Sequence, residues 1–202
     1  MRGAFITFEG GHGVGKSTMI DLTVNWLVQQ GRLVVRANDQ STEFGKVTRR
    51  MHLYDIKELT PLAETYLIAA MRVETLHRIV LPAIAANQVV IAERYADAVL
   101  AFGRARSTDE VVLKAVHESL LSMARPDATI LLDASPDQAL ARIDRHTAHR
   151  VELEPLAFHR SLRDRYREIS TADPTRVQVL NAQQPASIVW QELKQILTSL
   201  FS

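Results

Sequence analysis

A glycine-rich loop that ends in lysine and serine is the part of the sequence whose chemistry is most readily recognised. Residues 10–18 read GGHGVGKST, and the first eight match the pattern G-x-x-x-x-G-K-[ST]. In such loops backbone N–H groups surround nucleotide phosphates, the lysine contacts the β- and γ-oxygens, and the hydroxyl binds Mg²⁺. The sequence predicts these last two roles for Lys16 and Ser17. The candidate nucleotide-binding residues of the loop are Gly10, Gly11, His12, Gly13, Val14, Gly15, Lys16, Ser17 and Thr18.

The segments on either side of this loop support the interpretation. Residues 4–8, AFITF, form a short apolar run typical of a buried strand. After the loop, Ile20, Leu22, Trp26 and Leu27 follow a helical pattern, and the N-terminus of a helix there would attract phosphate. A nucleoside triphosphate site is therefore expected, although the loop alone does not distinguish a GTPase, an ATPase motor and a kinase.

Further apolar runs alternate with helical segments along the chain. We expect strands at residues 4–8, 33–36, 89–92, 129–133 and 177–180. These runs lack a polar alternate face, as expected of strands covered on both sides, and the segments between them can hold crossover helices. The prediction is an α/β fold of the P-loop NTPase type, with a five-stranded parallel sheet and helices on both faces. We expect one domain over residues 1–202.

Several residue pairs predict where helices begin and end. Thr60 and Pro61 open a segment that continues to about residue 86, where Pro82 should kink or end the helix and Asn87 should stop it. Two Ser–Glu/Gln pairs have the spacing of capping boxes, and a proline follows the second serine at the first helical position. These are Ser107 with Glu110 and Ser135 with Gln138, the latter followed by Pro136. An apolar face over residues 188–200 predicts a closing helix.

The composition limits the classes of partner. A net charge of +1 offers no general attraction to nucleic acid or to an anionic membrane, so anion binding must be local. The absence of cysteine excludes disulfides and thiolate metal sites and fits a reducing compartment. The first apolar run is too short for a signal peptide or a membrane span. We expect a cytoplasmic protein that binds neither a membrane nor a nucleic acid polymer.

Six segments in order along the chain resemble the thymidylate kinase family over essentially its whole length. Each segment is weak evidence alone, but their order and spacing are specific. They are FEG at residues 8–10, the segment from Ala63-Glu64 to Arg72 with PAI at 82–84, ERY at 93–95, RPDAT at 125–129 with LLD at 131–133 and Pro136, RVE at 150–152 with Phe158, Arg163 and Tyr166, and NAQQP at 181–185.

The resemblance implies a nucleoside monophosphate kinase that transfers the γ-phosphoryl group of ATP to a deoxynucleoside 5′-monophosphate, with dTMP as the leading acceptor. It implies Mg²⁺ as cofactor, a homodimer and a short lid at about residues 142–152. The catalytic candidates are Lys16, Glu93, Arg94 and Arg150, and the metal ligands are Ser17 and Glu93. Arg142 and Arg145 in the lid would bind ATP. The acceptor would contact Arg49, Ile68, Arg72, Arg94, Tyr95 and Phe102.

The departures from the family pattern lie mainly on the acceptor side. His12 replaces an acidic residue, residues 38–40 read NDQ in place of E-P-G/S, and Ile68 replaces an aromatic ring that stacks on thymine. Ala98 replaces a serine, and Glu93 replaces the signature aspartate. Three alternatives stay open: a kinase of a different nucleotide, a deoxynucleoside kinase with Glu93 as base, and a nucleotide-binding regulator without catalysis.

Three histidines near the lid invite a zinc interpretation, which the sequence does not favour. His146, His149 and His159 lie close together, but no acidic or cysteine partner has an obvious ligand spacing. We expect solvated lid histidines instead.

Overall fold

The computed structural model describes residues 3–144 and 146–202. Met1, Arg2 and Arg145 lie outside the described residues, and with them the predicted ATP contact of Arg145. None of the described helices is long and apolar enough to cross a membrane.

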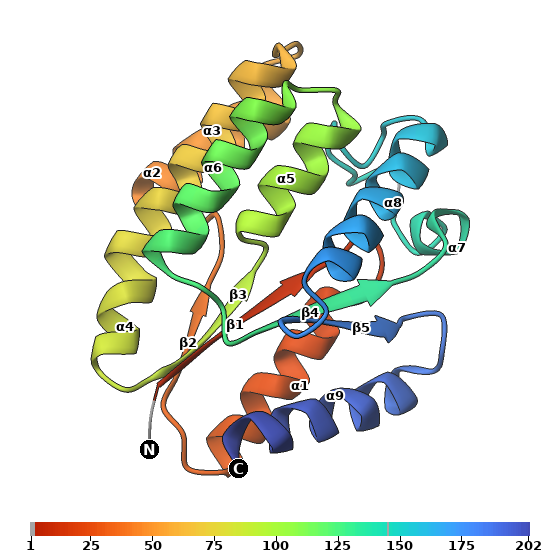
Figure 1. The fold of residues 1–202 in the computed structure, drawn as a ribbon. Helices are drawn as coiled ribbons and strands as arrows, with labels where there is room; N and C mark the ends of the chain where they lie inside the picture. Colours follow the sequence, from red (N-terminus) through yellow and green to blue (C-terminus); the bar gives the residue numbers. More distant parts are fainter. Residues whose placement is uncertain (1–2, 145) are drawn as a thin grey trace.

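Five parallel strands form one sheet in the order β2-β3-β1-β4-β5 (Figure 1). This confirms the predicted fold class, and each strand begins and ends within one residue of the range expected from the sequence. The strands are β1 (Ala4–Glu9), β2 (Val34–Ala37), β3 (Val89–Glu93), β4 (Ala128–Asp133) and β5 (Val177–Asn181).

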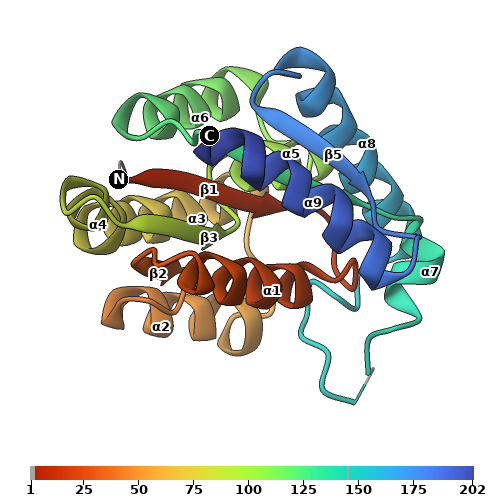
Figure 2. The same cartoon turned by 90° about the horizontal axis from the view of Figure 1, so that it is seen from below.

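Helices cover both faces of the sheet because its central strands are apolar on both faces (Figures 1 and 2). The α-helices are α1 (Lys16–Gln29), α2 (Glu43–Arg50), α3 (Pro61–Thr75), α4 (Leu81–Ala85), α5 (Ala96–Ala105), α6 (Glu110–Met123), α7 (Pro136–Leu140), α8 (Leu156–Ala172) and α9 (Ala186–Phe201), with π-helical turns η1 (Met51–Asp55) and η2 (Leu76–Val80). On β1, Ile6 and Phe8 pack in the core beneath α1 and α9, whereas Phe5 packs against the layer of α3 to α6. This alternation is the period of two expected of a strand.

The long helical segment after Thr60 begins as predicted, but it continues through Pro82 and does not end there. The Thr60 hydroxyl accepts a hydrogen bond from the Ala63 N–H. Six residues before Pro82 the α-helix gives way to the π-helical turn η2, and the chain remains helical through the proline to Ala85. A π-helical turn is a common site for irregular helical hydrogen bonding, so the missing proline N–H is accommodated there. Asn87, with φ of 58°, ends the segment as expected.

The two predicted capping boxes do not form. Asp109 caps α6 through hydrogen bonds from the N–H groups of Val111 and Val112, whereas Ser107 takes a left-handed conformation in the preceding turn. A carboxylate two residues nearer the helix displaces the serine because its oxygen reaches both free N–H groups. Ser135 does precede α7, with Pro136 in its first turn, but its side chain makes no capping hydrogen bond.

Candidate active site

One cavity of about 1040 Å³ opens at the carboxyl ends of β1 and β3. This is the edge of a parallel sheet where loops converge and ligands bind. The cavity wall combines the loop after β1, the segment after β2, helices α3 and α5, the loop before α8 and the loop after β5. Its lining includes His12, Gly13, Val14, Gly15, Lys16, Ser17, Thr18, Asp39, Arg49, Ile68, Arg72, Glu93, Arg94, Phe102, Arg142, His149, Glu152, Gln183 and Gln184.

Two glycines of the phosphate-binding loop, Gly10 and Gly13, are required by close packing and by backbone conformation. A Cβ on Gly10 would lie 2.4 Å from the Leu132 carbonyl oxygen, and one on Gly13 would lie 2.0 Å from that of Ala139. Both have positive φ. Gly10 packs against Leu132, and neither Gly10 nor Gly11 lines the main cavity. They shape the loop, while residues 12–18 face the cavity.

The Lys16 side chain is buried inside this loop. Its ammonium donates to the carbonyl oxygens of Gly11 at 2.6 Å and Gly10 at 3.4 Å. Burial and the nearby charge of Arg94 lower the pKa of Lys16 to about 7. An anionic phosphate in the loop would reverse this shift, so the site is electrostatically suited to a polyphosphate.

Two oxygen ligands suitable for a metal face the same cavity. Ser17 lies in the first turn of α1, exposed to the cavity, and Glu93 lies at the end of β3. Hydroxyl and carboxylate oxygens are the donors that Mg²⁺ prefers. These side chains therefore fit the metal role expected for them from the sequence.

Arg94 links the phosphate-binding loop to the acceptor side. It has a φ of 64°, unusual for a long side chain and typical of strained functional positions. Its guanidinium donates to the Gly10 carbonyl at 2.9 Å and the Tyr166 hydroxyl at 3.0 Å, and it lies 5.0 Å from the centre of the Phe102 ring. These contacts hold the Arg94 charge between the phosphate-binding loop, at Gly10, and the acceptor side of the cavity, at Phe102.

A buried carboxylate that we did not propose as a site residue, Glu9, positions Arg94 and its neighbours. It accepts hydrogen bonds from the Tyr95 N–H at 2.6 Å and the Tyr166 hydroxyl at 2.9 Å. Burial and repulsion from Asp97 raise the pKa of Glu9, although the charge of Arg94 opposes this. The FEG segment contained the signal, because an acid directly after an apolar strand must be paired when the strand is central.

Asp39 is a second residue that the sequence did not identify, and it binds two predicted acceptor residues. It pairs with Arg49 at 3.3 Å and also contacts Arg72. Arg72 is only 4% exposed, and burial lowers its pKa to about 10. The guanidinium groups of Arg49 and Arg72 thus both contact the Asp39 carboxylate. A phosphate that binds there would either contact the two arginines together with Asp39 or replace Asp39 as their partner.

Of the three residues predicted to contact the acceptor's base and sugar, two line the cavity and one does not. Ile68 and Phe102 line the cavity, as expected. Tyr95 does not: its ring packs edge-on against Phe5 at 5.1 Å, and its hydroxyl donates to the Leu120 carbonyl. The side chain points into the core because Arg94, one residue earlier, points into the cavity and the chain turns between them. The acceptor assignment of Tyr95 is therefore wrong.

The lid arginines occupy different places. Arg142 lines the cavity and donates to the Gly13 carbonyl at 3.4 Å. Arg150 does not line it. Its guanidinium donates to the Glu64 carboxylate at 2.8 Å and the His52 carbonyl at 3.0 Å. Reaching a transferring phosphoryl group would require Arg150 to leave Glu64.

Glu64 holds Arg150 through a compact cluster. Besides Arg150, it accepts hydrogen bonds from Arg106 at 3.0 Å and lies 2.6 Å from the His52 ring nitrogen. Burial tends to raise the pKa of Glu64, but His52 and the two guanidinium groups lower it to about 2. The sequence did not predict this cluster, whose members come from η1, α3, the α5–α6 turn and the loop before α8.

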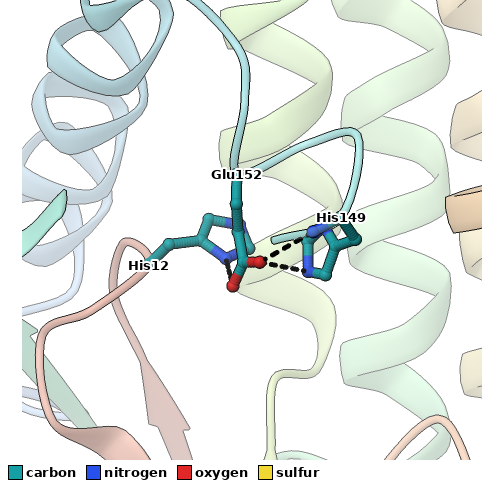
Figure 3. A group of neighbouring side chains, drawn as sticks. All are labelled: His12, His149 and Glu152. Atoms are coloured by element: carbon teal, nitrogen blue, oxygen red, sulfur yellow. Dashed lines mark hydrogen bonds and ion pairs between the residues drawn. The ribbon is translucent and has the colours of Figure 1, made fainter. Parts of the chain in front are cut away.

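The expectation that the lid histidines are solvated is correct only for His146, which is exposed. His159 is buried, and His149 lies against the Glu152 carboxylate at 3.5 Å. His12 from the phosphate-binding loop approaches the same carboxylate at 3.4 Å, so three groups converge from two segments (Figure 3). The acidic partner, Glu152, lies only three residues after His149, so the expectation that no acidic residue has a ligand spacing is wrong. Chain folding adds His12 from the distant phosphate-binding loop.

The comparisons with known proteins agree with one another. Residues 8–193 match the family model described as Thymidylate kinase. Relatives named thymidylate kinase from Afipia carboxidovorans and Methylococcus capsulatus are each 34% identical, over 98% and 99% of this chain and 92% and 97% of theirs. A solved thymidylate kinase from Ehrlichia chaffeensis is 22% identical with a TM-score of 0.79, covering 98% of this chain and 99% of its own, and thus shares the fold.

A phosphate-binding loop that faces a group of arginines across one cavity, one of them buried, is typical of P-loop phosphotransferases that act on nucleoside monophosphates. The family model and the relatives that are 34% identical over nearly the whole chain narrow this class to one family. The chain belongs to the thymidylate kinase family, as its sequence segments predicted.

Proposed function

We propose that this protein transfers the γ-phosphoryl group of ATP to dTMP, giving dTDP and ADP. The observation that carries the proposal is the single cavity that joins the phosphate-binding loop to Arg49, Arg72 and Arg94. Phosphoryl transfer between two anionic substrates depends mainly on positioning and on stabilising charge. Cations at both ends of one cavity meet that need.

The buried Arg72 favours a phosphate acceptor over a hydroxyl acceptor. Arg72 is nearly inaccessible, and keeping an unpaired charge buried costs several kcal/mol. Asp39 offsets part of this cost in the free protein, and the acceptor's phosphate would add to the compensation. Phe102 lines the cavity, and if the acceptor's sugar lies against it as the family resemblance implies, its ring would leave little room for a 2′-hydroxyl and would favour deoxyribose.

The residues of the chain have distinct roles in this reaction. Lys16 and the N–H groups of residues 12–18 would bind the ATP phosphates. Gln183 and Gln184, which line the same cavity in the loop after β5, would contact the adenine. Ser17 and Glu93 would hold Mg²⁺, which neutralises phosphate charge when bound. Arg94 would lie between donor and acceptor. Arg142 would contact ATP from the lid, and Arg150 would reach the phosphoryl group when the lid closes.

ADP release measured with a panel of acceptors tests this function. With ATP and Mg²⁺, we expect the highest kcat/KM for dTMP, lower values for dUMP, dCMP and dGMP, and none for thymidine. Phosphorylation of thymidine but of no monophosphate would instead identify a deoxynucleoside kinase with Glu93 as base. ATP binding without phosphorylation of any acceptor would identify a regulatory protein.

Ile68→Phe should raise kcat/KM for dTMP about fivefold to 150-fold, because stacking of a base on an aromatic ring is worth about 1–3 kcal/mol. Ile68 lines the cavity and can pack against a pyrimidine but cannot stack as a ring does. Steady-state kinetics with dTMP and dCMP measures the change. Ile68→Leu is the matched control, since it alters shape without adding a ring; an equal gain from leucine, or no gain from phenylalanine, contradicts stacking.

We also infer a homodimer built on α3 and α6, which contact each other. Val111 on α6 is 78% exposed, and Leu62 and Tyr66 on α3 are also exposed. Apolar groups on adjacent helices suit a two-fold interface. Light scattering at micromolar concentration should give a dimer, and Val111→Lys should shift it toward monomer. Val28→Lys on α1, also at an exposed valine, should not; a wild-type monomer contradicts the inference.

We also propose that residues 1–202 form one nucleoside monophosphate kinase-like domain with a lid at about residues 142–152, and that the protein is cytoplasmic. In the described part of the chain, residues between α7 and α8 form only turns and loop, which suits a lid.

A further inference from the structure

Two histidines and a glutamate from separate segments converge beside the phosphate-binding loop (Figure 3). His12 belongs to that loop, and His149 and Glu152 belong to the segment before α8. We propose that these three side chains form a binding site for a transition-metal dication of the Zn²⁺ class, distinct from the Mg²⁺ site at Ser17. The bound ion would join the phosphate-binding loop to the lid segment.

The separations of the three groups suit a bound ion better than direct hydrogen bonds. His12 Nδ1 lies 3.4 Å from one Glu152 oxygen and His149 Nε2 lies 3.5 Å from the other, longer than the usual N–H···O range of about 2.7–3.2 Å. Tetrahedral Zn²⁺, with bonds of about 2.0–2.1 Å, separates its ligand atoms by about 3.4 Å. One ligand atom from each residue lies within 4.8 Å of the other two.

The protonation states also suit metal binding. Burial lowers the pKa of His12 to about 3 and lowers that of His149, so both imidazoles are neutral near pH 7. The contact with His12 is the main cause that lowers the pKa of Glu152 to about 2, so its carboxylate is ionised. No ligand has to lose a proton before a metal binds. The His149 backbone N–H also donates to Glu152 at 3.1 Å and orients the carboxylate.

The ligand set determines which metals the site would accept. Two imidazoles and one carboxylate are a set found in zinc sites that keep a fourth position open. All three residues line the main cavity, so a water or a substrate oxygen could take that position. Mg²⁺ prefers six oxygen ligands and should bind poorly here. The charges of Lys16 and Arg94 near His12 oppose a dication, which predicts moderate rather than very tight affinity.

Metal titration of the nucleotide-free full-length chain, with any affinity tag removed, tests the proposal. We expect one equivalent of Zn²⁺ by calorimetry and one equivalent of Co²⁺ with the visible absorption of tetrahedral coordination. An excess of Mg²⁺ should displace neither ion. Because no substrate is present, the result does not depend on the proposed phosphoryl transfer.

Three single variants and one control locate the site. His12→Asn, His149→Asn and Glu152→Ala should each weaken Zn²⁺ binding at least about tenfold, since even indirect metal partners contribute that much. His146→Asn changes an exposed histidine of the same segment and should leave binding unchanged. Circular dichroism verifies that each variant is folded. No saturable binding by the wild type, or binding that survives in the three folded variants, overturns the proposal.

Discussion

Lys16→Ala should lower kcat for phosphoryl transfer at least about 100-fold while the protein remains folded, because a fixed cation contributes mainly to stabilising charge in the transition state. The ammonium contacts the carbonyl oxygens of Gly10 and Gly11 in the free protein. Its removal therefore breaks two hydrogen bonds. Among the residues that the structure describes, no carboxylate forms an ion pair with Lys16, so none loses its partner. Circular dichroism should show an unchanged fold, and ADP release should show the loss.

The lowered pKa of Lys16 gives this prediction a second measurement. With a pKa of about 7, the side chain is half neutral near pH 7, and phosphate binding should restore its charge. Wild-type protein should take up roughly half a proton per ATP at that pH, measured by calorimetry in buffers of different ionisation enthalpy. The uptake should disappear in Lys16→Ala.

Lys46→Ala on α2 is the matched control for both measurements. Lys46 is an exposed lysine that pairs with Glu43 and does not line the cavity. Its loss should affect neither turnover nor proton uptake. An active Lys16→Ala protein that binds ATP as the wild type does would refute the assigned role.

Arg150→Ala should lower kcat about 100-fold or more and change the Kd for ATP only a few-fold. In the described structure its guanidinium binds Glu64 and the His52 carbonyl, outside the cavity lining. We expect it to contact the phosphoryl group only when the lid closes, so its contribution should belong to the transition state. Single-turnover kinetics and equilibrium ATP binding separate the two quantities.

Arg160→Ala provides the comparison, since Arg160 is an exposed arginine on α8 that pairs with Asp137. It removes the same charge near the lid and should change neither kcat nor ATP affinity. Equal losses of kcat and ATP affinity in Arg150→Ala would mean ground-state binding only. No loss would mean that Arg150 has a structural role in the Glu64 cluster.

The sequence by itself determined the elements of the fold and the phosphate-binding loop. Apolar runs located five strands to within one residue, because a buried strand must satisfy its backbone hydrogen bonds within the sheet and present apolar groups on both faces. The glycine, lysine and serine spacing identified the loop, because that function uses backbone and side chains within one turn of chain. Both signals are local.

Helix starts were determined less well, because several short polar residues compete for the same N–H groups. Ser107 had the capping spacing, yet Asp109 lies nearer the first turn of α6 and caps it. The sequence contains both candidates, and only the direction of the chain before the helix decides between them.

The tertiary structure alone decided which side chains meet. Asp39 joins Arg49 to Arg72, Glu64 holds Arg150, and Glu152 joins two histidines, with partners up to 140 residues apart. Tyr95 faces the core although its neighbour Arg94 faces the cavity. Such contacts depend on how distant helices pack on the sheet and on which anion is nearest to each buried cation. The spacing of residues along the chain specifies neither the packing of the helices nor the nearest anion.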